Sequence, residues 1–98
     1  MKFEKHYSNL HIYASFNDTT FDVYSYDSKI MIVDTLHKQV IINTKYLDYS
    51  PTTTRHFTKS LKMFGLDTNI KQIRKAIQDY RDYWLITKIQ NFDILPIQ

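Results

Sequence analysis

The dipeptide Ser50-Pro51 divides the chain into two halves with different hydrophobic periods. A hydroxyl residue followed by proline is a typical helix start. The hydroxyl accepts a hydrogen bond from a free backbone N–H, and proline at the first helical position loses no hydrogen bond. Before this point apolar residues occur in short runs rich in β-branched and aromatic side chains, and after it they recur at helical spacing. Strands followed by helices predict an α+β domain with separate layers.

Four segments of the first half have the composition of strands: residues 10–16, 20–26, 29–34 and 39–43. The last two pair naturally as a hairpin around residues 34–38. This loop has no glycine, which favours a longer loop built on a type I turn over a two-residue turn. Both faces of the hairpin are apolar, which predicts a central place in the sheet with helices on one side. We expect a small antiparallel sheet of three to four strands packed against two helices.

Two helices are expected in the second half. The apolar stripe of the first consists of Phe57, Leu61 and Phe64, at i, i+4 and i+7. Gly65 stands where a residue in the left-handed conformation ends a helix, and Asp67 or Thr68 is expected to cap the next one. The apolar stripe of the second helix is Ile70, Ile73, Ile77, Tyr80 and Trp84.

The segment after the second helix is less regular. Residues 83–89 have strand-like composition, and Pro96 is expected to stop any regular element. The tail, residues 91–98, can pack on the sheet through Phe92, Ile94 and Leu95. A strand in this region would extend the sheet, and its exposed edge would be able to pair with a second copy of the chain. A homodimer is therefore among the expected assemblies.

The charge of the chain is unevenly distributed. Its 98 residues fit one domain, spanning 1–98, with a net charge of +3. Residues 1–49 hold five basic and six acidic side chains, whereas residues 50–98 hold eight and four. This asymmetry favours an anionic partner, either nucleic acid or an acidic protein surface, although an ordinary solvated pair of helices carries similar charge.

The basic side chains gather on the outer faces of the two predicted helices. At about 100° per residue, those of the first helix lie within about 60° of one another, opposite its apolar stripe. Those of the second lie in an arc of about 120°. The candidate partner-binding residues are Arg55, Lys59, Lys62, Lys71, Arg74, Lys75 and Arg81. Such a pair of helices is similar to a helix-turn-helix, but Leu61 stands where that motif needs a small residue and Lys71 where it needs an apolar one.

Residues that could carry catalysis form no recognisable motif. The absence of cysteine excludes a disulfide framework, a thiolate metal site and a cysteine nucleophile. The four histidines show no metal-ligand spacing, and the single glycine allows neither a phosphate-binding loop nor a nucleophile elbow. His56 is expected on the helix surface or bonded to a backbone group, and helix capping explains Thr53 three residues before it. We expect no enzyme activity, no metal and no cofactor; a small hydrolase or nuclease would need an acid–histidine–metal cluster.

Two features bear on location. No apolar run approaches the ~20 residues that span a bilayer, so no membrane partner is expected. The N-terminus leads into no apolar segment of the kind that makes a secretory signal. Together with the absence of cysteine, this fits a reducing cytoplasm.

The octapeptide at residues 49–56, Tyr-Ser-Pro-Thr-Thr-Thr-Arg-His, is the most distinctive motif. With the hairpin before it and the apolar helix after it, this motif resembles a group of small, mostly uncharacterised proteins of phages and mobile elements in Gram-positive bacteria. These share a short hairpin followed by Y-S-x-T-T-[ST]-[RK]-H. The resemblance covers roughly residues 25–65. The matching positions are Tyr49, Ser50, Thr52, Thr53, Thr54, Arg55 and His56, with Phe57 and Leu61 following.

The resemblance implies a small accessory protein that acts by binding in the cytoplasm of a bacterial host. In that context the leading hypothesis is a non-enzymatic inhibitor of a host nucleic-acid-targeting defence complex, similar in action to an anti-CRISPR protein. It would occlude the effector protein or its guide nucleic acid with the basic helical face. The alternative is a regulatory protein that binds DNA or RNA directly through the same face.

Overall fold

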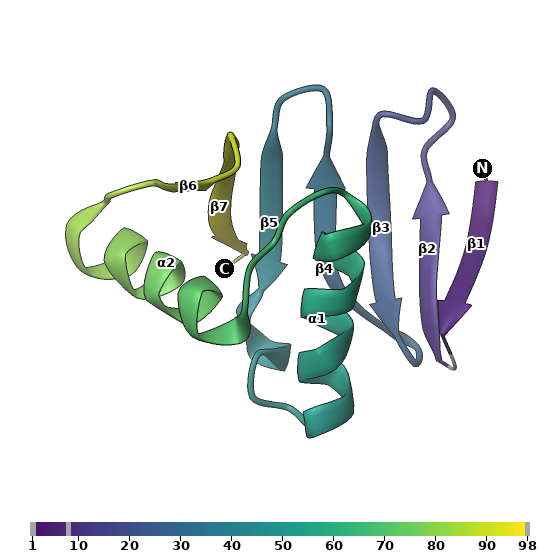
Figure 1. Cartoon of the computed structure of the whole chain (residues 1–98), viewed down its shortest axis with the longest axis horizontal. Coiled ribbons are helices and arrows are strands. Elements are labelled where there is room, and N and C mark those ends of the chain that lie inside the picture. The colour runs from purple at the N-terminus through teal and green to yellow at the C-terminus, as the bar shows by residue number, and fades with distance from the viewer. Residues whose placement is uncertain (1, 8, 98) are drawn as a thin grey trace.

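The strand-rich first half and the helical second half form two layers, with both helices on one face of a sheet (Figure 1). The structure is a computed structural model that describes the backbone of residues 2–7 and the whole of residues 9–97. In chain order the elements are β1 (Lys2–Tyr7), β2 (Leu10–Ala14), β3 (Thr20–Ser25), β4 (Ser28–Asp34), β5 (Gln39–Asn43), the 3-10 turn η1 (Thr44–Tyr46), α1 (Pro51–Met63), α2 (Ile70–Tyr83), β6 (Thr87–Ile89) and β7 (Phe92–Ile97). The α+β class predicted from the sequence is confirmed.

The sheet is larger than expected and it is mixed. Within residues 2–7 and 9–97 it has seven strands in the order β1-β2-β3-β4-β5-β7-β6, which is more than the three to four expected, and the expected antiparallel pairing holds for every neighbouring pair except β5 and β7. Strands β1 to β5 form an antiparallel meander, whereas β7 lies parallel to β5, with Val40 opposite Ile94. A parallel pair needs a crossover connection, and here both helices belong to that crossover. The hairpin β4–β5 is central in the sheet, as predicted.

The core lies between the sheet and the helices. Alternate residues of the central strands point toward the helices and are fully buried; they include Val23, Val33, Val40, Ile42 and Ile94. Phe57 and Leu61 of α1 and Ile73 of α2 are also fully buried in this cluster. Because burial of one such side chain contributes about 1.5–3 kcal/mol, the cluster fixes both helices to the same face.

Helix α1 begins and ends where the sequence predicts. The Oγ of Ser50 accepts a hydrogen bond from the backbone N–H of Thr53 at 3.1 Å, which is an N-cap. At the other end Gly65 has a φ of +85°, and the N–H of Leu66 donates to the carbonyl of Leu61 at 3.0 Å. This combination closes the helix with a left-handed glycine and satisfies one of its free carbonyls.

Helix α2 begins later than expected. Its N-cap is Asn69, whose Oδ1 accepts from the N–H of Gln72 at 2.9 Å, so the prediction of Asp67 or Thr68 as the cap is wrong. The N–H of Asp67 instead donates to the side-chain oxygen of Gln90, in the β6–β7 hairpin. That long-range contact holds the chain extended for two further residues before the helix starts.

The connection between the helices does not have the geometry of a helix-turn-helix. It runs through residues 64–69, longer than the three- to four-residue turn of that motif, and each helix packs on the sheet. Neither helix within the described residues has the length and apolar character to span a membrane.

The end of α2 also differs from the prediction. Trp84 was expected on the apolar stripe, but the helix ends at Tyr83 and Trp84 adopts the left-handed conformation with φ 58° and ψ 25°. This turn rotates its side chain away from the core, and it is 78% exposed. The strand-like character of residues 83–89 is confirmed only for the short strand β6.

The tail packs on the sheet as expected, with Phe92 and Ile94 buried. It does so as β7, which continues through Pro96 to Ile97, so the expectation that proline ends regular structure here is wrong. The pairing of β7 with β6 extends only to Ile94, opposite Thr87. Beyond that point one side of β7 is open, and a residue without an N–H is tolerated at a free edge.

Candidate functional site

The motif at residues 49–56 builds a buried polar network at the start of α1. Ser25, the last residue of β3, is 2% exposed, Thr53 is 2% exposed and His56 is 4% exposed. The Oγ of Ser25 lies 2.7 Å from Nδ1 of His56 and 3.1 Å from Oγ1 of Thr53. The hydroxyl of Ser50 donates to Oγ1 of Thr53 at 3.1 Å. The prediction that His56 lies on the surface or bonds to the backbone is therefore wrong.

Burial lowers the pKa of His56, and the nearby charges of Arg55, His11 and Lys59 lower it further. A neutral imidazole can accept a hydrogen bond at Nδ1. In the tautomer whose Nδ1 accepts, the hydroxyls can form one ordered chain: Ser50 donates to Thr53, Thr53 to Ser25 and Ser25 to His56. A serine–histidine pair is common to hydrolases, but a nucleophile must reach its substrate, and Ser25, although it lines a small pocket, is only 2% exposed. The network therefore fixes α1 to β3.

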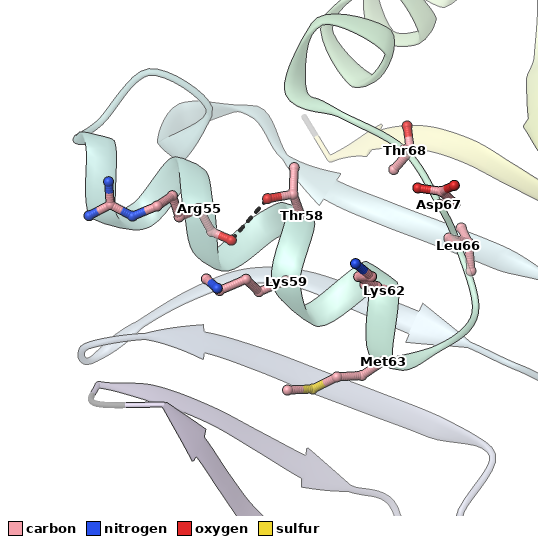
Figure 2. Close-up of a pocket in the computed structure, with 8 residues that line it drawn as sticks. All are labelled: Arg55, Thr58, Lys59, Lys62, Met63, Leu66, Asp67 and Thr68. Atoms are coloured by element: carbon pink, nitrogen blue, oxygen red, sulfur yellow. Dashed lines mark hydrogen bonds between the residues drawn. The ribbon is translucent and has the colours of Figure 1, made fainter.

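The opposite side of α1 carries the basic side chains. Arg55, Lys59 and Lys62 are exposed and line a groove of about 630 Å³ between α1 and the connector to α2. Figure 2 shows the three side chains along one side of the helix and residues 66–68 on the connector. The other lining residues are Thr58, Met63, Leu66, Asp67 and Thr68. The predicted cluster on the first helix is thus present and faces away from the core.

The groove concentrates positive charge. Three cations and the carboxylate of Asp67 line it, and the cations occupy successive turns of α1. Like charges at i, i+4 and i, i+3 destabilise a helix by about 0.2–0.5 kcal/mol per pair. Arg55 with Lys59, and Lys59 with Lys62, have these spacings. An anion in the groove would relieve this repulsion as well as bind, so the arrangement is suited to a partner with several negative charges.

The basic residues of α2 are placed differently and do not line the groove. The guanidinium of Arg74 forms an ion pair with Asp48, and that of Arg81 donates to Oγ1 of Thr44 at 2.8 Å. Both contacts face the segment that follows β5. The ammonium group of Lys75 lies 3.3 Å from the carboxylate of Asp79, one turn along the helix.

The four candidate residues of α2 are therefore separate from the groove. Lys71, Arg74, Lys75 and Arg81 are all exposed. Three of them already hold polar partners in their own part of the molecule. The seven residues singled out in the sequence consequently form two surfaces, and the three on α1 line the groove.

The histidines and carboxylates of the described residues form no metal-binding cluster, although His11, Asp22 and Asp27 line one pocket beside β2 and β3. No group of three or more His, Asp or Glu side chains in residues 9–97 is placed to hold a metal ion. Asp34 acts as a loop residue, as its position in the β4–β5 turn predicts: its Oδ1 accepts from the N–H groups of Leu36 and His37 at 3.1 and 3.0 Å. The backbone and side-chain hydrogen bonds from His37 lower the pKa of Asp34.

The fold and the site define a small α+β protein with a basic groove on one amphipathic helix. The comparison with known families goes one step further: residues 1–79 match the family of unknown function DUF8033, and the chain belongs to this family. No curated protein and no solved structure matches the chain. The matched residues include the motif and the groove, whereas the end of α2 and strands β6 and β7 lie outside the match.

Proposed function

We propose that the protein is a non-enzymatic inhibitor that binds an anionic surface of a host nucleic-acid-targeting defence complex and blocks it. The observation that carries the proposal is the groove of Arg55, Lys59 and Lys62 on the outer side of α1. The inner side of the same helix is fixed to β3 by the network around His56. A cationic surface on a rigid element contacts a partner with little loss of conformational entropy.

The dimensions of the groove suit a polyanion. Lys62 lies seven positions after Arg55, which corresponds to about 10 Å along a helix. This is about three nucleotide steps of ~3.4 Å along one strand of a duplex. A stretch of guide or target backbone, or a row of carboxylates on an effector protein, has charges at comparable spacing.

The groove also contains apolar surface. Met63 lies beside the cations and is 39% exposed, whereas the connector residue Leu66 lines the groove but is only 1% exposed. A phosphate backbone alone does not use such surface, whereas protein surfaces combine charged and apolar contacts. This mixture, together with the resemblance of the Y-S-x-T-T-[ST]-[RK]-H motif to proteins of phages and mobile elements, favours an effector–guide complex over free nucleic acid. The protein would act in the cytoplasm of the bacterial host.

Target cleavage by a purified, guide-loaded effector nuclease from a Gram-positive host tests the proposal. The variant Arg55→Glu/Lys59→Glu/Lys62→Glu is expected to weaken inhibition at least tenfold. The matched control Lys71→Glu/Lys75→Glu makes the same kind of charge change outside the groove and is expected to inhibit like the unaltered protein. Equal inhibition by the groove variant would contradict the proposal.

Direct binding of nucleic acid is the second candidate, because cations on successive turns of one helix are also a phosphate-binding arrangement. It predicts that a fluorescent single-stranded oligonucleotide binds the protein alone, with an affinity that falls steeply with salt. Binding at physiological salt without any effector favours this alternative. No binding even at low salt removes it.

A further inference from the structure

Four consecutive apolar residues that begin with the last residue of α2 are exposed to an unusual degree. The exposed fractions are 68% for Tyr83, 78% for Trp84, 58% for Leu85 and 51% for Ile86. We call these residues the C-terminal apolar patch. Single exposed apolar residues are common on protein surfaces, but a contiguous group of large ones marks an interaction surface. The patch lies outside the groove and outside the residues that match the family.

Trp84 is held in a backbone conformation that is rare for its residue type. Its φ of 58° is left-handed, a region that bulky residues seldom adopt and that glycine or asparagine usually supplies at helix ends. The N–H of Trp84 donates to the carbonyl of Tyr80 at 3.0 Å, and the N–H of Leu85 to that of Asp79 at 3.4 Å. The ring of Tyr80 packs edge-on against the indole at 5.7 Å. A strained backbone therefore presents a fixed, exposed indole, which is unfavourable in an isolated monomer.

A free strand edge continues directly from the patch. Strand β6 begins at Thr87, directly after Ile86, and it is the outermost strand of the sheet. In the part of the chain described here, its outer edge pairs with no other strand. Lys88 of β6 is neutralised by Asp93 of β7, at 2.6 Å. Backbone groups able to pair and apolar side chains able to pack thus share one stretch, with little net charge to repel a neighbour.

We propose that the C-terminal apolar patch and the free edge of β6 form the interface of a two-fold homodimer. A second copy carries the same edge and the same patch, and a two-fold axis brings both features together at once. Burial of one aromatic side chain removes about 150–250 Å² from water, so two aromatic and two aliphatic side chains supply a large part of the ~800 Å² per partner of a stable interface. This inference is independent of the proposed function, because it uses no groove residue.

The unaltered protein provides the first test, since Trp84 is its only tryptophan. Sedimentation equilibrium over a wide concentration range is expected to show the mass rising from 11.8 kDa to twice that value. Tryptophan emission is expected to shift to shorter wavelength over the same range, with the same midpoint, because association buries the indole. A mass of 11.8 kDa throughout, or a mass increase without an emission shift, overturns the proposal.

The variant Trp84→Gly provides the second test. It is expected to raise the dimer dissociation constant at least ~30-fold, as removal of a central aromatic does in other interfaces. Its monomer is expected to be at least as resistant to heat as the unaltered chain, because glycine suits the left-handed position. The matched control is Phe16→Gly, which removes a fully exposed aromatic from the β2–β3 turn and leaves association unchanged. A Trp84→Gly protein that dimerises with unaltered affinity would show that the patch is not the interface. An unaltered protein that stays monomeric and uses Trp84 to bind a different protein would contradict the homodimer itself.

Discussion

The Oγ of Ser25 lies 2.7 Å from Nδ1 of His56, although 31 positions separate the two residues in the chain. This hydrogen bond joins the end of β3 to the second turn of α1. His56 points inward, and its neighbour Arg55 is exposed on the outer side of the helix. One short motif therefore both attaches the helix and presents its charge.

The variant Ser25→Ala is expected to lower the free energy of unfolding by about 1–3 kcal/mol, because it leaves Nδ1 of His56 without its hydrogen-bond partner inside the core. The hydroxyl of Thr53 loses one partner and keeps Ser50. Urea denaturation measures this change. The control Thr58→Ala removes an exposed hydroxyl from the same helix and is expected to change stability by less than about 0.5 kcal/mol. Equal stability of the two variants would show that the buried network contributes little.

Stability is expected to fall as the pH is lowered through the range in which His56 becomes protonated. Because burial lowers the pKa of His56 in the folded chain, the unfolded chain binds the proton first. The contribution of His56 is therefore complete above about pH 6.5, the ordinary pKa, and is lost progressively as the pH falls toward the lowered folded value. Melting temperatures between about pH 8 and 5 measure the effect.

The variant His56→Asn keeps a polar atom near the position of Nδ1 but does not titrate, so its melting temperature is expected to vary less over this range. Asp34 does not interfere, because its lowered pKa moves its own loss of stability below about pH 3.8. The control Thr58→Ala, which removes a non-titrating hydroxyl from the same helix, is expected to keep the pH dependence of the unaltered protein. An unchanged slope for His56→Asn would contradict the assignment to His56.

Neutralising one groove cation, as in Lys62→Gln, is expected to weaken binding to a polyanion and to reduce the magnitude of its salt dependence by about one unit of slope. The reason is that one fewer counterion is released when the complex forms. Anisotropy titrations of a labelled oligonucleotide at several salt concentrations measure the slope. Lys75→Gln is the matched control, because Lys75 is paired with Asp79 and lies outside the groove. Equal slopes for both variants would place the contact elsewhere.

Two substitutions just before α2 are expected to change affinity and stability independently of each other. Asp67→Asn removes a carboxylate that lines the groove, so affinity for a polyanion should rise while stability changes little. Asn69→Ala removes the true N-cap and should lower the free energy of unfolding by about 1 kcal/mol without changing affinity. Parallel titration and denaturation of the two variants check this separation. A large stability loss in Asp67→Asn would contradict it.

Gly65→Ala is expected to destabilise the protein by about 1 kcal/mol through backbone conformation alone. Gly65 has a φ of +85°, and a Cβ added there would meet no atom within 4 Å. Gly65→Asn is expected to lose less stability, because asparagine tolerates the left-handed region better than alanine. Thermal melts of both variants check the order. A larger loss for asparagine than for alanine would indicate a steric cause instead.

Features set by neighbouring residues were predictable from the sequence. Ser50, Pro51 and Gly65 mark the ends of α1 through local hydrogen bonds and backbone preference. Strands β2 to β5 follow from short apolar runs, and the outward direction of Arg55 and Lys62 follows from helical geometry alone.

Features that depend on distant partners were not predictable. Gln90 delays the start of α2 by holding Asp67, and Ser25 draws His56 into the core. Asp48, far from Arg74 in the chain, pairs with it and separates part of the predicted basic face from the groove. Strand β1 contains three charged residues, Lys2, Glu4 and Lys5, and no apolar run, so its pairing with β2 was not predictable.

The insertion of β7 beside β5 has a consequence for aggregation. In the chain, β7 is connected to β5 through the long crossover that contains both helices. It can therefore lose its hydrogen bonds to β5 without any change in the meander β1 to β5. A chain with β7 detached would expose the edge of β5, whose sequence Gln39-Val40-Ile41-Ile42-Asn43 has no charge, no proline and three β-branched residues. Uncharged strands of this composition readily pair with copies of themselves into fibrils. By pairing with β5, strand β7 thus covers an aggregation-prone edge about fifty residues before it in the chain.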